Sequence, residues 1–320
     1  MSDDHELGVL GHDLMGDMLD FNSGSVTFEH TDVDIPGNNA LSVSIKRRLT
    51  RGILYDQGQS ASFGDWEIMA PRIVATTAPG TNFRILNRCS GTNPFQPIQL
   101  NYNLGPGQTD ANTGLPYTSK TYQPHEYTQG MEIQTPEYGV EKVLRSGLTG
   151  NFGPYTSSDK FVTRSNFKIS CLSNISGGGE GFLAKSPDGF TYRFDRFYER
   201  RTQDDILSNY YEPDQARYRS IIAATEVTDV HGNWVRYVYD SHNRLSRIHS
   251  NDGREITLAY PGIDEPISSV TANGRTWTYQ YTTRQQRYGL PPKKWFILRV
   301  RVFGYFALEG ARYGEETLHT

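Results

Sequence analysis

The stretch Val227–Ile248, "VTDVHGNWVRYVYDSHNRLSRI", decides the fold class of this chain. It holds two turn signals, one at His231-Gly232 and one at Asp240–Asn243, and between them a run of alternating aromatic and aliphatic residues. Aromatic and β-branched residues of this kind are typical of a strand. A single hairpin predicts only β-structure, so the next question is whether this unit repeats.

Glycine turns recur at a fixed spacing after this stretch. Gly232, Gly253 and Gly274 follow one another at intervals of 21 residues. The third, fifth and seventh positions after each glycine are all apolar or aromatic, and they are Val235, Tyr237, Tyr239, Ile256, Leu258, Tyr260, Trp277, Tyr279 and Tyr281. At 36% hydrophobic residues, chance gives this result about once in 10,000. We therefore predict a repeated strand-turn-strand-turn unit, which must stack on its neighbours to bury its apolar face.

The second turn of the unit is the segment Asp240–Asn243, "DSHN". We expect the carboxylate of Asp240 to accept hydrogen bonds from backbone N–H groups ahead of it, and Asn243 to adopt a left-handed conformation. Leu245 and Ile248 follow three positions apart, so on a regular strand their side chains would point to opposite faces. Their strand is therefore either buried on both faces or interrupted by a bulge.

The composition favours an all-β protein. The chain has 320 residues, of which 36% are hydrophobic and 12% aromatic, with 20 Tyr and 15 Phe. Aromatic side chains suit a pleated surface, and disordered chains contain few of them. The net charge of −4 argues against nucleic acid or an anionic membrane as partner.

No targeting or membrane-spanning segment is predicted. The N-terminus, "MSDDHELGVLGHDLMGDML", is acidic and lacks the features of a signal peptide. No apolar run reaches the roughly 18 residues that a span needs. The two cysteines, Cys89 and Cys171, have no metal-ligand spacing, and the sequence leaves open whether they form a disulfide.

The repeat residues resemble the YD repeat of the RHS (rearrangement hot spot) family. That pattern is a Gly, a short strand ending in Tyr-x-Tyr-Asp, two residues, then Gly-Arg-Leu and an aliphatic residue three positions on. Here it reads "GNWVRYVYDSHNRLSRI", with Asn243 where the family usually has Gly. The positions that carry the pattern and its copies are Gly232, Tyr237, Tyr239, Asp240, Asn243, Leu245, Gly253, Tyr260, Gly274 and Tyr281.

The resemblance extends upstream. The segments "SGSVTFEHTDVDIPGNNALSVSIKRR" and "FGDWEIMAPRI" are similar to the entry segment of bacterial RHS proteins, and "CLSNISGGGEGFLAKSPDGFTYRFD" is similar to the segment that follows it. Together these similarities cover about residues 20–283.

The resemblance implies an all-β fold in which an entry β-domain leads into a β-sheet ribbon that winds into a hollow shell. Members of the family enclose a C-terminal effector, usually a toxin, and are secreted or displayed at the cell surface. The implied partners are the rest of the shell and that effector. Because no signal peptide is present here, a cytoplasmic location before export is also left open.

Four regions are predicted along the chain. They are an N-terminal arm over 1–20, the entry β-domain over 21–173, the YD repeats over 174–283 and a divergent tail over 284–320. The repeats are too few to close a shell, and no self-cleavage motif is present. The tail breaks the 21-residue phase, which suggests a frameshifted or truncated gene; the alternative is one more amphipathic strand pair.

Several motifs that suggest chemistry have simpler explanations. His30, Asp32 and Asp34 alternate like a metal or acid-base cluster, but no fourth ligand is signalled, which favours the solvent face of a strand. "GGGEGFLAKS" places Lys185 wrongly for a phosphate loop. "YRFDRFYERR" interleaves arginines and aromatics, as in binders of single-stranded nucleic acid, but its acidic residues favour a solvated strand.

We predict a non-catalytic structural scaffold with no catalytic, cofactor-binding or metal-binding residues. The alternative is a carbohydrate-binding cell-surface module in which Trp277 and Tyr279 stack on sugars, although aromatic stripes at strand spacing more often form a core. A third possibility is an enzyme whose site is assembled only in space, because Gly-x-Ser-x-Gly and other recognisable arrangements are absent from the sequence.

Overall fold

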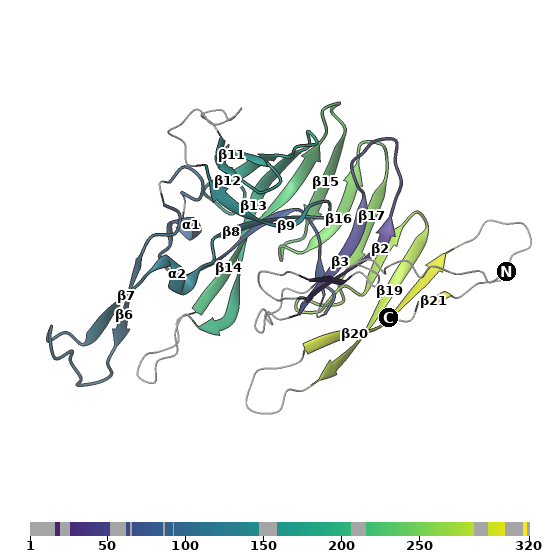
Figure 1. The fold of residues 1–320 in the computed structure, drawn as a ribbon. Helices are drawn as coiled ribbons and strands as arrows, with labels where there is room; N and C mark the ends of the chain where they lie inside the picture. The colour runs from purple at the N-terminus through teal and green to yellow at the C-terminus, as the bar shows by residue number, and fades with distance from the viewer. Residues whose placement is uncertain are drawn as a thin grey trace, which may run out of the picture. The chain divides into compact units, whose positions relative to one another are not determined.

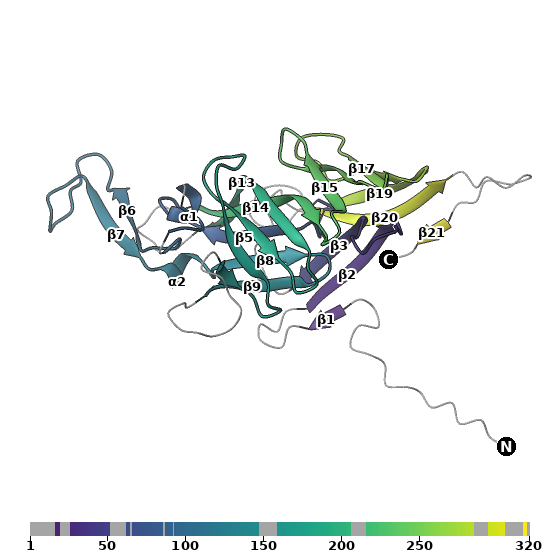
Figure 2. The same cartoon turned by 90° about the horizontal axis from the view of Figure 1, so that it is seen from above.

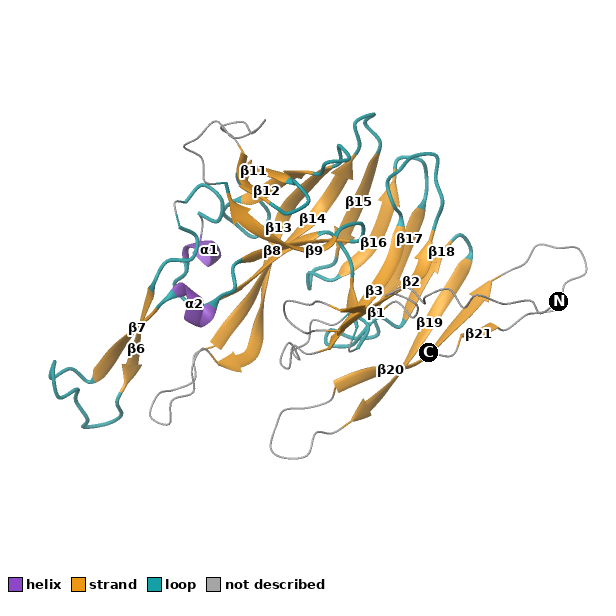
Figure 3. Cartoon of the chain, in the orientation of Figure 1, coloured by secondary structure: helices purple, strands orange, loops and turns teal. Residues whose placement is uncertain are grey.

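The computed structural model describes ten stretches of the chain. They are residues 17–19, 26–51, 62–64, 66–85, 87–91, 93–146, 159–205, 216–284, 294–304 and 316–318. The regular secondary structure of the described residues is almost entirely β-strand, with two helices of four residues each (Figure 3). The prediction of an all-β protein is confirmed.

The chain forms two compact units, each assembled from separated stretches of sequence. Unit 1 contains Met1–Ile35, Ser44–Met69 and Leu258–Thr320, and unit 2 contains Pro36–Val43 and Ala70–Thr257. The predicted boundary between residues 173 and 174 therefore does not separate compact units. Strands on both sides of that boundary pair with one another in unit 2, because a sheet joins neighbours in space whatever their place in the sequence.

Eight antiparallel strands of unit 2 close into a barrel (Figures 1 and 2). In order around the wall they are β13 (Thr191–Asp205), β12 (Gly181–Lys185), β11 (Lys168–Leu172), β10 (Asp159–Val162), β9 (Gly139–Arg145), β8 (Met131–Thr135), β5 (Arg72–Thr77) and β14 (Ala216–Thr228). Closure depends on β14, which pairs with β13 along one edge and with β5 along the other. The barrel core holds large aromatic side chains that are at most 2% exposed, namely Phe161, Phe167, Phe182, Tyr192 and Phe194.

A hairpin ribbon continues from the barrel at the end of β14. There, β14 pairs with β15 (Trp234–Tyr239), which pairs with β16 (Leu245–Ser250), which pairs with β17 (Glu255–Ala259). Strands β5 and β15 pair with the same edge of β14, β5 along Tyr218–Ala223 and β15 along Glu226–Thr228. The ribbon therefore leaves the barrel wall at the point on β14 where the pairing with β5 ends.

A separate hairpin and two short helices complete unit 2 (Figure 3). The hairpin is formed by β6 (Ile98–Asn103) and β7 (Tyr117–Tyr122), and the helices are α1 (Asn82–Ile85) and α2 (Pro124–Tyr127). Ile98, Tyr122 and Tyr127 are buried and pack together where the hairpin meets α2.

Unit 1 contains two sets of antiparallel strands. The first is β1 (Asp17–Leu19), β2 (Val26–Asp34), β3 (Ser44–Arg51) and β4 (Glu67–Ile68). The second is β18 (Ser269–Ala272), β19 (Arg275–Arg284), β20 (Lys294–Gly304) and β21 (Glu316–Leu318). Strand β20 lies in the predicted divergent tail and pairs with β19 from Lys294 to Gly304. This pairing agrees with the alternative interpretation of the tail, in which it adds one more strand pair. The N-terminal arm, apart from Asp17–Leu19, lies outside the described residues.

Candidate functional site

Four turns of unit 2 share one five-residue geometry. In each, the N–H of the first residue donates to the carbonyl of the fifth at 2.8–3.0 Å, and the N–H of the fourth donates to the carbonyl of the first at 3.1–3.3 Å. The turns are Ser186–Phe190, Asp229–Asn233, Asp240–Arg244 and Ser250–Arg254. The fourth residue has a positive φ in every case, and these residues are Gly189, Gly232, Asn243 and Gly253. The left-handed conformation expected of Asn243 is present, at φ 58°.

Asp240 acts as the cap of its turn. Its Oδ1 accepts the backbone N–H groups of His242 at 2.8 Å and Arg244 at 2.9 Å, and its Oδ2 accepts the Arg244 Nε–H at 2.8 Å. Burial raises the pKa of Asp240, but the hydrogen bonds from Arg244 and His242 outweigh it, so the pKa is lowered overall. Asp229 binds His231 and Asn233 in the same way. Both carboxylates therefore stabilise turns and are poorly suited to proton transfer.

The 21-residue spacing does not mark one kind of turn throughout. Gly232 and Gly253 occupy the same turn position, and Asn243 takes that position between them, so one period contains two turns. Gly274 follows Asn273, which also has a positive φ, and the flanking Ala272 and Arg275 pair directly. This is a two-residue hairpin turn. The sequence signal that the four five-residue turns share is a Ser or Asp three residues before the Gly or Asn, and the sequence-based prediction used it only at Asp240.

The fifth residue after Gly232, Gly253 and Gly274 is buried in each case, as expected for the packed face of a strand. Tyr237 is 8%, Leu258 7% and Tyr279 5% exposed. Tyr239 donates its hydroxyl to the Ala224 carbonyl at 2.9 Å, and Tyr281 donates to the Ile267 carbonyl at 2.5 Å. Tyr260 is half-buried. These tyrosines serve as packing residues that also satisfy buried carbonyl groups.

Leu245 and Ile248 are both buried, at 4% and 2% exposed, although their parity differs. The register of β15 and β16 shifts between Val238 and Tyr239, because Val238 pairs with Arg247 while Tyr239 pairs with Leu245. A bulge opposite Tyr239 therefore turns both aliphatic side chains to the same face.

The two residues proposed to stack on sugars differ in access. The ring of Tyr279 lies 4.8 Å from that of Phe63, and its hydroxyl donates to Asp32 at 2.9 Å. With 5% of its surface exposed, Tyr279 presents no ring face to a dissolved sugar. Trp277 is half-buried, so a stacking surface of this kind would rest on Trp277 alone.

His30, Asp32 and Asp34 do not share one solvent face. The register of β2 against β3 shifts between Thr31 and Val33, and this bulge turns the Asp32 side chain inward, where it is 2% exposed. The expected solvent face therefore holds for His30 and Asp34, and the bulge is the reason that it fails for Asp32.

Asp32 joins a histidine, an arginine and a tyrosine in the way that acid-base sites do. Its Oδ1 lies 2.9 Å from His30 Nδ1 and accepts the Arg47 Nε–H at 3.1 Å, while its Oδ2 accepts the Tyr279 hydroxyl. Arg47 is 2% exposed and packs 4.6 Å from the Trp66 ring centroid. Burial and the Asp32 charge raise the pKa of Tyr279, which keeps the phenol protonated as a donor. Both carboxylate oxygens are occupied, which fits a buried structural ion pair.

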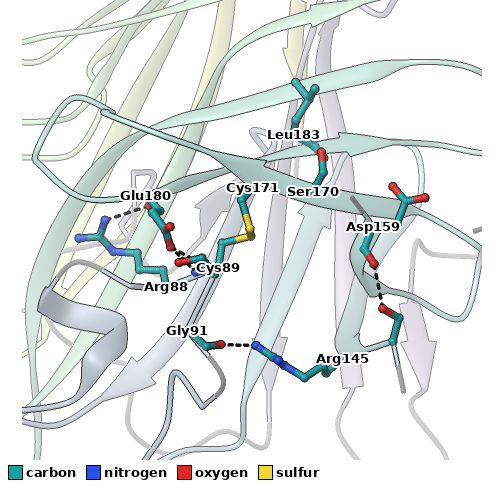
Figure 4. The surroundings of a disulfide bond; sticks show 11 residues. Arg88, Cys89, Gly91, Arg145, Asp159, Ser170, Cys171, Glu180 and Leu183 are labelled. Atoms are coloured by element: carbon teal, nitrogen blue, oxygen red, sulfur yellow. Dashed lines mark hydrogen bonds between the residues drawn. A yellow bond between two sulfur atoms is a disulfide. The ribbon is translucent and has the colours of Figure 1, made fainter. Parts of the chain in front are cut away.

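A disulfide joins Cys89 and Cys171, whose Cα atoms are 5.4 Å apart (Figure 4). The Glu180 carboxylate accepts the backbone N–H groups of Cys89 and Ser90, both at 2.9 Å. Arg88 is fully buried, donates to the carbonyl of Glu180 at 2.9 Å and lies 3.5 Å from the Phe197 ring centroid. Burial lowers the pKa of Arg88 to about 10, so it remains charged near neutral pH.

The glycine-rich loop 177–181 is fixed against β13. A Cβ atom on Gly181 would lie 2.2 Å from the Phe194 carbonyl oxygen, and one on Gly177 the same distance from that of Phe197. Lys185 lies on β12 and is exposed. These two glycines therefore allow the close approach of two backbones.

Unit 2 contains a further ion pair, between Arg84 of α1 and Glu199 of β13. Arg84 donates through two nitrogens to Glu199, each at 2.8 Å, and stacks 3.7 Å from the Tyr218 ring centroid. Glu199 also accepts the hydroxyl of Ser220 at 2.8 Å, and Ser220 bonds to Thr77 at the same distance. The network links α1, β13, β14 and β5, and its groups satisfy one another.

A small cavity in unit 2 has room for about one water molecule. Tyr192, Tyr237 and Glu137 are among the residues that line it, and the Tyr192 hydroxyl donates to Glu137 at 3.3 Å. Burial raises the pKa of both tyrosines. The space is too small for a substrate, so it has the character of a packing defect or a water site.

A metal site or a membrane-crossing helix in the described part of the chain would be a further sign of function. No group of three or more His, Cys, Asp or Glu side chains is placed there to hold a metal ion. Among the helices of the same ranges, none has the length and apolar character that crossing a membrane demands.

Comparison with known proteins gives no relative from which a role can be transferred. No protein-family model matches the chain, and no curated protein matches it.

Proposed function

We propose that this chain is a non-catalytic structural scaffold, a segment of the shell wall of an RHS-type polymorphic toxin or cell-surface protein. In this proposal the complete shell encloses a C-terminal effector and delivers it. The remainder of the shell and the effector are then the partners of this chain.

One observation carries the proposal. Successive strands from β14 to β17 are joined by the same five-residue turn at Asp229–Asn233, Asp240–Arg244 and Ser250–Arg254. Each strand adds to the last with its aromatic or aliphatic residues on the buried face. A repeated unit of this kind can extend a wall by adding further copies.

The state of the ionisable groups also supports a scaffold. Asp240 and Asp229 cap turns, Asp32 holds Arg47, Glu180 binds the chain beside the disulfide and Glu199 holds Arg84. Catalytic acids and bases usually need a proton-transfer partner in a cleft. These carboxylates are instead bound by groups of the fold itself.

The coding DNA downstream of Thr320 provides the test. We expect one of its three reading frames to continue with YD repeats, followed by a small effector domain. The joined product, expressed as one chain, should protect that effector from a protease that digests it when free. A downstream region without such repeats in any frame, or an effector digested equally fast in both forms, would overturn the proposal.

A glycan array distinguishes the alternative function, binding of surface carbohydrate, from the scaffold. Binding that is lost on Trp277→Ala, while the variant keeps its unfolding midpoint, would favour a sugar-binding module over the scaffold.

A further inference from the structure

The hairpin of β6 and β7 forms an arm, residues 98–122, whose two outer edges are open. Each of its strands pairs only with the other among the described strands. Figures 1 and 2 both show this arm extending away from the barrel of unit 2. A two-stranded sheet on its own is only marginally stable in water, so a further strand at one of its edges would stabilise the arm.

The register of the arm identifies the backbone groups that lie at the open edge of β6. The N–H of Leu104 donates to the carbonyl of Pro116 at 3.1 Å, one position beyond the last paired residue of β6. Hydrogen-bonded and non-hydrogen-bonded positions alternate along an antiparallel pair. The N–H and C=O groups of Gln99, Asn101 and Asn103 therefore point away from β7. No described strand pairs with them, so they can bind a further strand.

Strand β6 lacks the features that usually protect an edge strand. Natural proteins commonly block such edges with Lys, Pro or a β-bulge. Ile98–Asn103 contains no proline and no charged residue, and it pairs with β7 residue by residue without a bulge. Strand β7 carries Lys120, which makes its own edge less suited to pairing. The edge of β6 is therefore the better docking site.

The edge of β6 is suited to a second copy of itself. In an antiparallel pair of two β6 strands centred on Asn101, the two Asn101 residues lie opposite each other, and Gln99 of each copy lies opposite Asn103 of the other. The side chains of Gln99 and Asn101 are exposed, and an amide both donates and accepts hydrogen bonds, so like amides can pair. Asn101 Oδ1 accepts the Ser119 hydroxyl at 2.6 Å, which orients the Asn101 amide.

The charge of the arm also fits a second copy of the chain. The arm contains one acidic residue, Asp110, and one basic residue, Lys120, so it is neutral although the whole chain has a net charge of −4. Two arms therefore approach each other without the repulsion that two acidic surfaces would meet.

We propose that two copies of this chain associate by pairing their β6 edges about a two-fold axis at Asn101. The two arms then form one four-stranded antiparallel sheet in the order β7, β6, β6, β7. The same edge serves both copies, so the association closes at two chains. Main-chain hydrogen bonds supply the affinity, and the amide side chains supply the register. This inference does not depend on the scaffold role, because its test needs neither the downstream DNA nor an effector.

Sedimentation velocity of the full chain over a concentration series tests the proposal. An interface between two strand edges is small, so we expect a reversible dimer at roughly 10–100 µM. A chain that stays monomeric up to about 1 mM would overturn the proposal and leave the edge to a strand of another protein.

Proline substitutions on the two strands separate edge pairing from folding of the arm. Asn101→Pro removes an N–H that points away from β7, so the arm keeps its own backbone hydrogen bonds. The dimer loses two central hydrogen bonds, one from each copy, and should weaken roughly tenfold or more. An unchanged dimerisation constant would overturn the proposal.

The matched control is Ser119→Pro, directly opposite on β7. It removes an equivalent outward N–H and the same hydrogen bond between Ser119 and Asn101, but it leaves the edge of β6 intact. We expect the dimerisation constant of this variant to be unchanged, and both variants to keep the thermal midpoint of the wild type. Equal weakening by both substitutions would assign the effect to folding of the arm and would overturn the proposal.

An introduced cysteine tests the register directly. The two native cysteines are joined to each other, so the new one is the only free thiol. Opposite residues of an antiparallel pair have Cα atoms about 4.5–5.5 Å apart, a distance that a disulfide spans. Under mild oxidation Asn101→Cys should give a covalent dimer on a non-reducing gel, and Ser119→Cys should not. Cross-linking of both variants at the same rate, or of neither, would overturn the proposal.

Discussion

Backbone conformation decides which residues the hairpin turns accept. Gly232 has a φ of 84° and open space around its missing side chain, so any substitution there meets only conformational strain. Gly181 has the opposite problem, because its missing Cβ would collide with the Phe194 carbonyl at 2.2 Å. The two glycines are thus required for different physical reasons.

This difference gives a prediction for alanine substitutions. Gly232→Ala should lower the free energy of unfolding by about 1–2 kcal/mol, the cost of a left-handed alanine. Gly181→Ala should lower it further, because β13 or the glycine-rich loop must shift. Urea denaturation of both variants measures this, and an equal or smaller loss at Gly181 would contradict the close approach seen here.

A carboxylate beside an arginine makes the stability of unit 2 depend on pH. Asp252 accepts hydrogen bonds from Arg254 and from Ser250. The Arg254 hydrogen bond is the largest of the causes that lower the pKa of Asp252 to about 2. Arg254 also donates to the Leu41 carbonyl at 2.9 Å and to Asn39 at 3.0 Å, so Asp252 orients a side chain that holds segment 36–43.

The sign of the pH effect follows from the lowered pKa. An unfolded Asp titrates near 3.9, so the Asp252 contribution is fully present above about pH 4 and is lost as the pH falls towards 2. Asp252→Asn should therefore reduce stability near neutral pH and flatten the fall in stability over that acid range. Thermal unfolding across the range measures it, with the exposed Asp264→Asn as control. An unchanged acid profile in Asp252→Asn would argue against the ion pair.

At the scale of elements, the disulfide connects the segment after α1 to β11. Its two cysteines are 82 residues apart, so the cross-link limits a large part of the unfolded chain. Local contacts accompany it, since Glu180 binds the N–H groups of Cys89 and Ser90. The segment is therefore fixed both covalently and by hydrogen bonds.

Removal of the cross-link should be costly without abolishing the fold. We expect Cys89→Ser combined with Cys171→Ser to lower the free energy of unfolding by about 2–4 kcal/mol, mainly through greater freedom of the unfolded chain. Urea denaturation with and without a reductant is the measurement. The wild type should lose stability on reduction, and the double variant should not respond; a wild type that is insensitive to reductant would speak against the bond.

At the scale of the whole molecule, closure of the barrel depends on one long-range element. Strand β14 pairs Tyr218 with Thr77 and Thr191 with Thr228, and it is the element that joins β5 to β13. All eight barrel strands lie between residues 72 and 228. A fragment that ends before β14 lacks the closing strand.

Two fragments test this dependence. Residues 70–257 should fold with a cooperative unfolding transition and an intact disulfide. Residues 70–205 should show no cooperative transition, because β5 and β13 would each keep an open edge. Far-UV circular dichroism during thermal unfolding distinguishes them, and cooperative unfolding of the shorter fragment would show that closure is not essential.

Local features of the fold were predictable because they depend on neighbouring residues. The alternation after Gly232 predicts β15, Asn243 has the expected left-handed backbone, and Asp240 caps the turn ahead of it. Glycine spacing was less informative, because Gly274 belongs to a different turn type that the same spacing does not reveal.

The candidate sites depended on pairings that the sequence does not specify. Strict alternation would leave Asp32 in solvent, and the bulge that turns it towards Arg47 and Tyr279 exists only in the paired sheet. The same pairing covers the Tyr279 ring, which removes it from any sugar-binding surface. Burial of a side chain against a distant strand is therefore the step at which sequence-based prediction of these sites failed.

The sequence by itself determined that this is an all-β protein of repeated hairpins, because alternation and turn residues act over a few neighbouring positions. Tertiary structure alone decided that eight strands close into a barrel, that Cys89 and Cys171 meet and that β6 keeps an open edge among the described strands. These outcomes depend on which distant strands pair and in what register. Many registers satisfy the same local pattern, and only the packing of the complete barrel selects one.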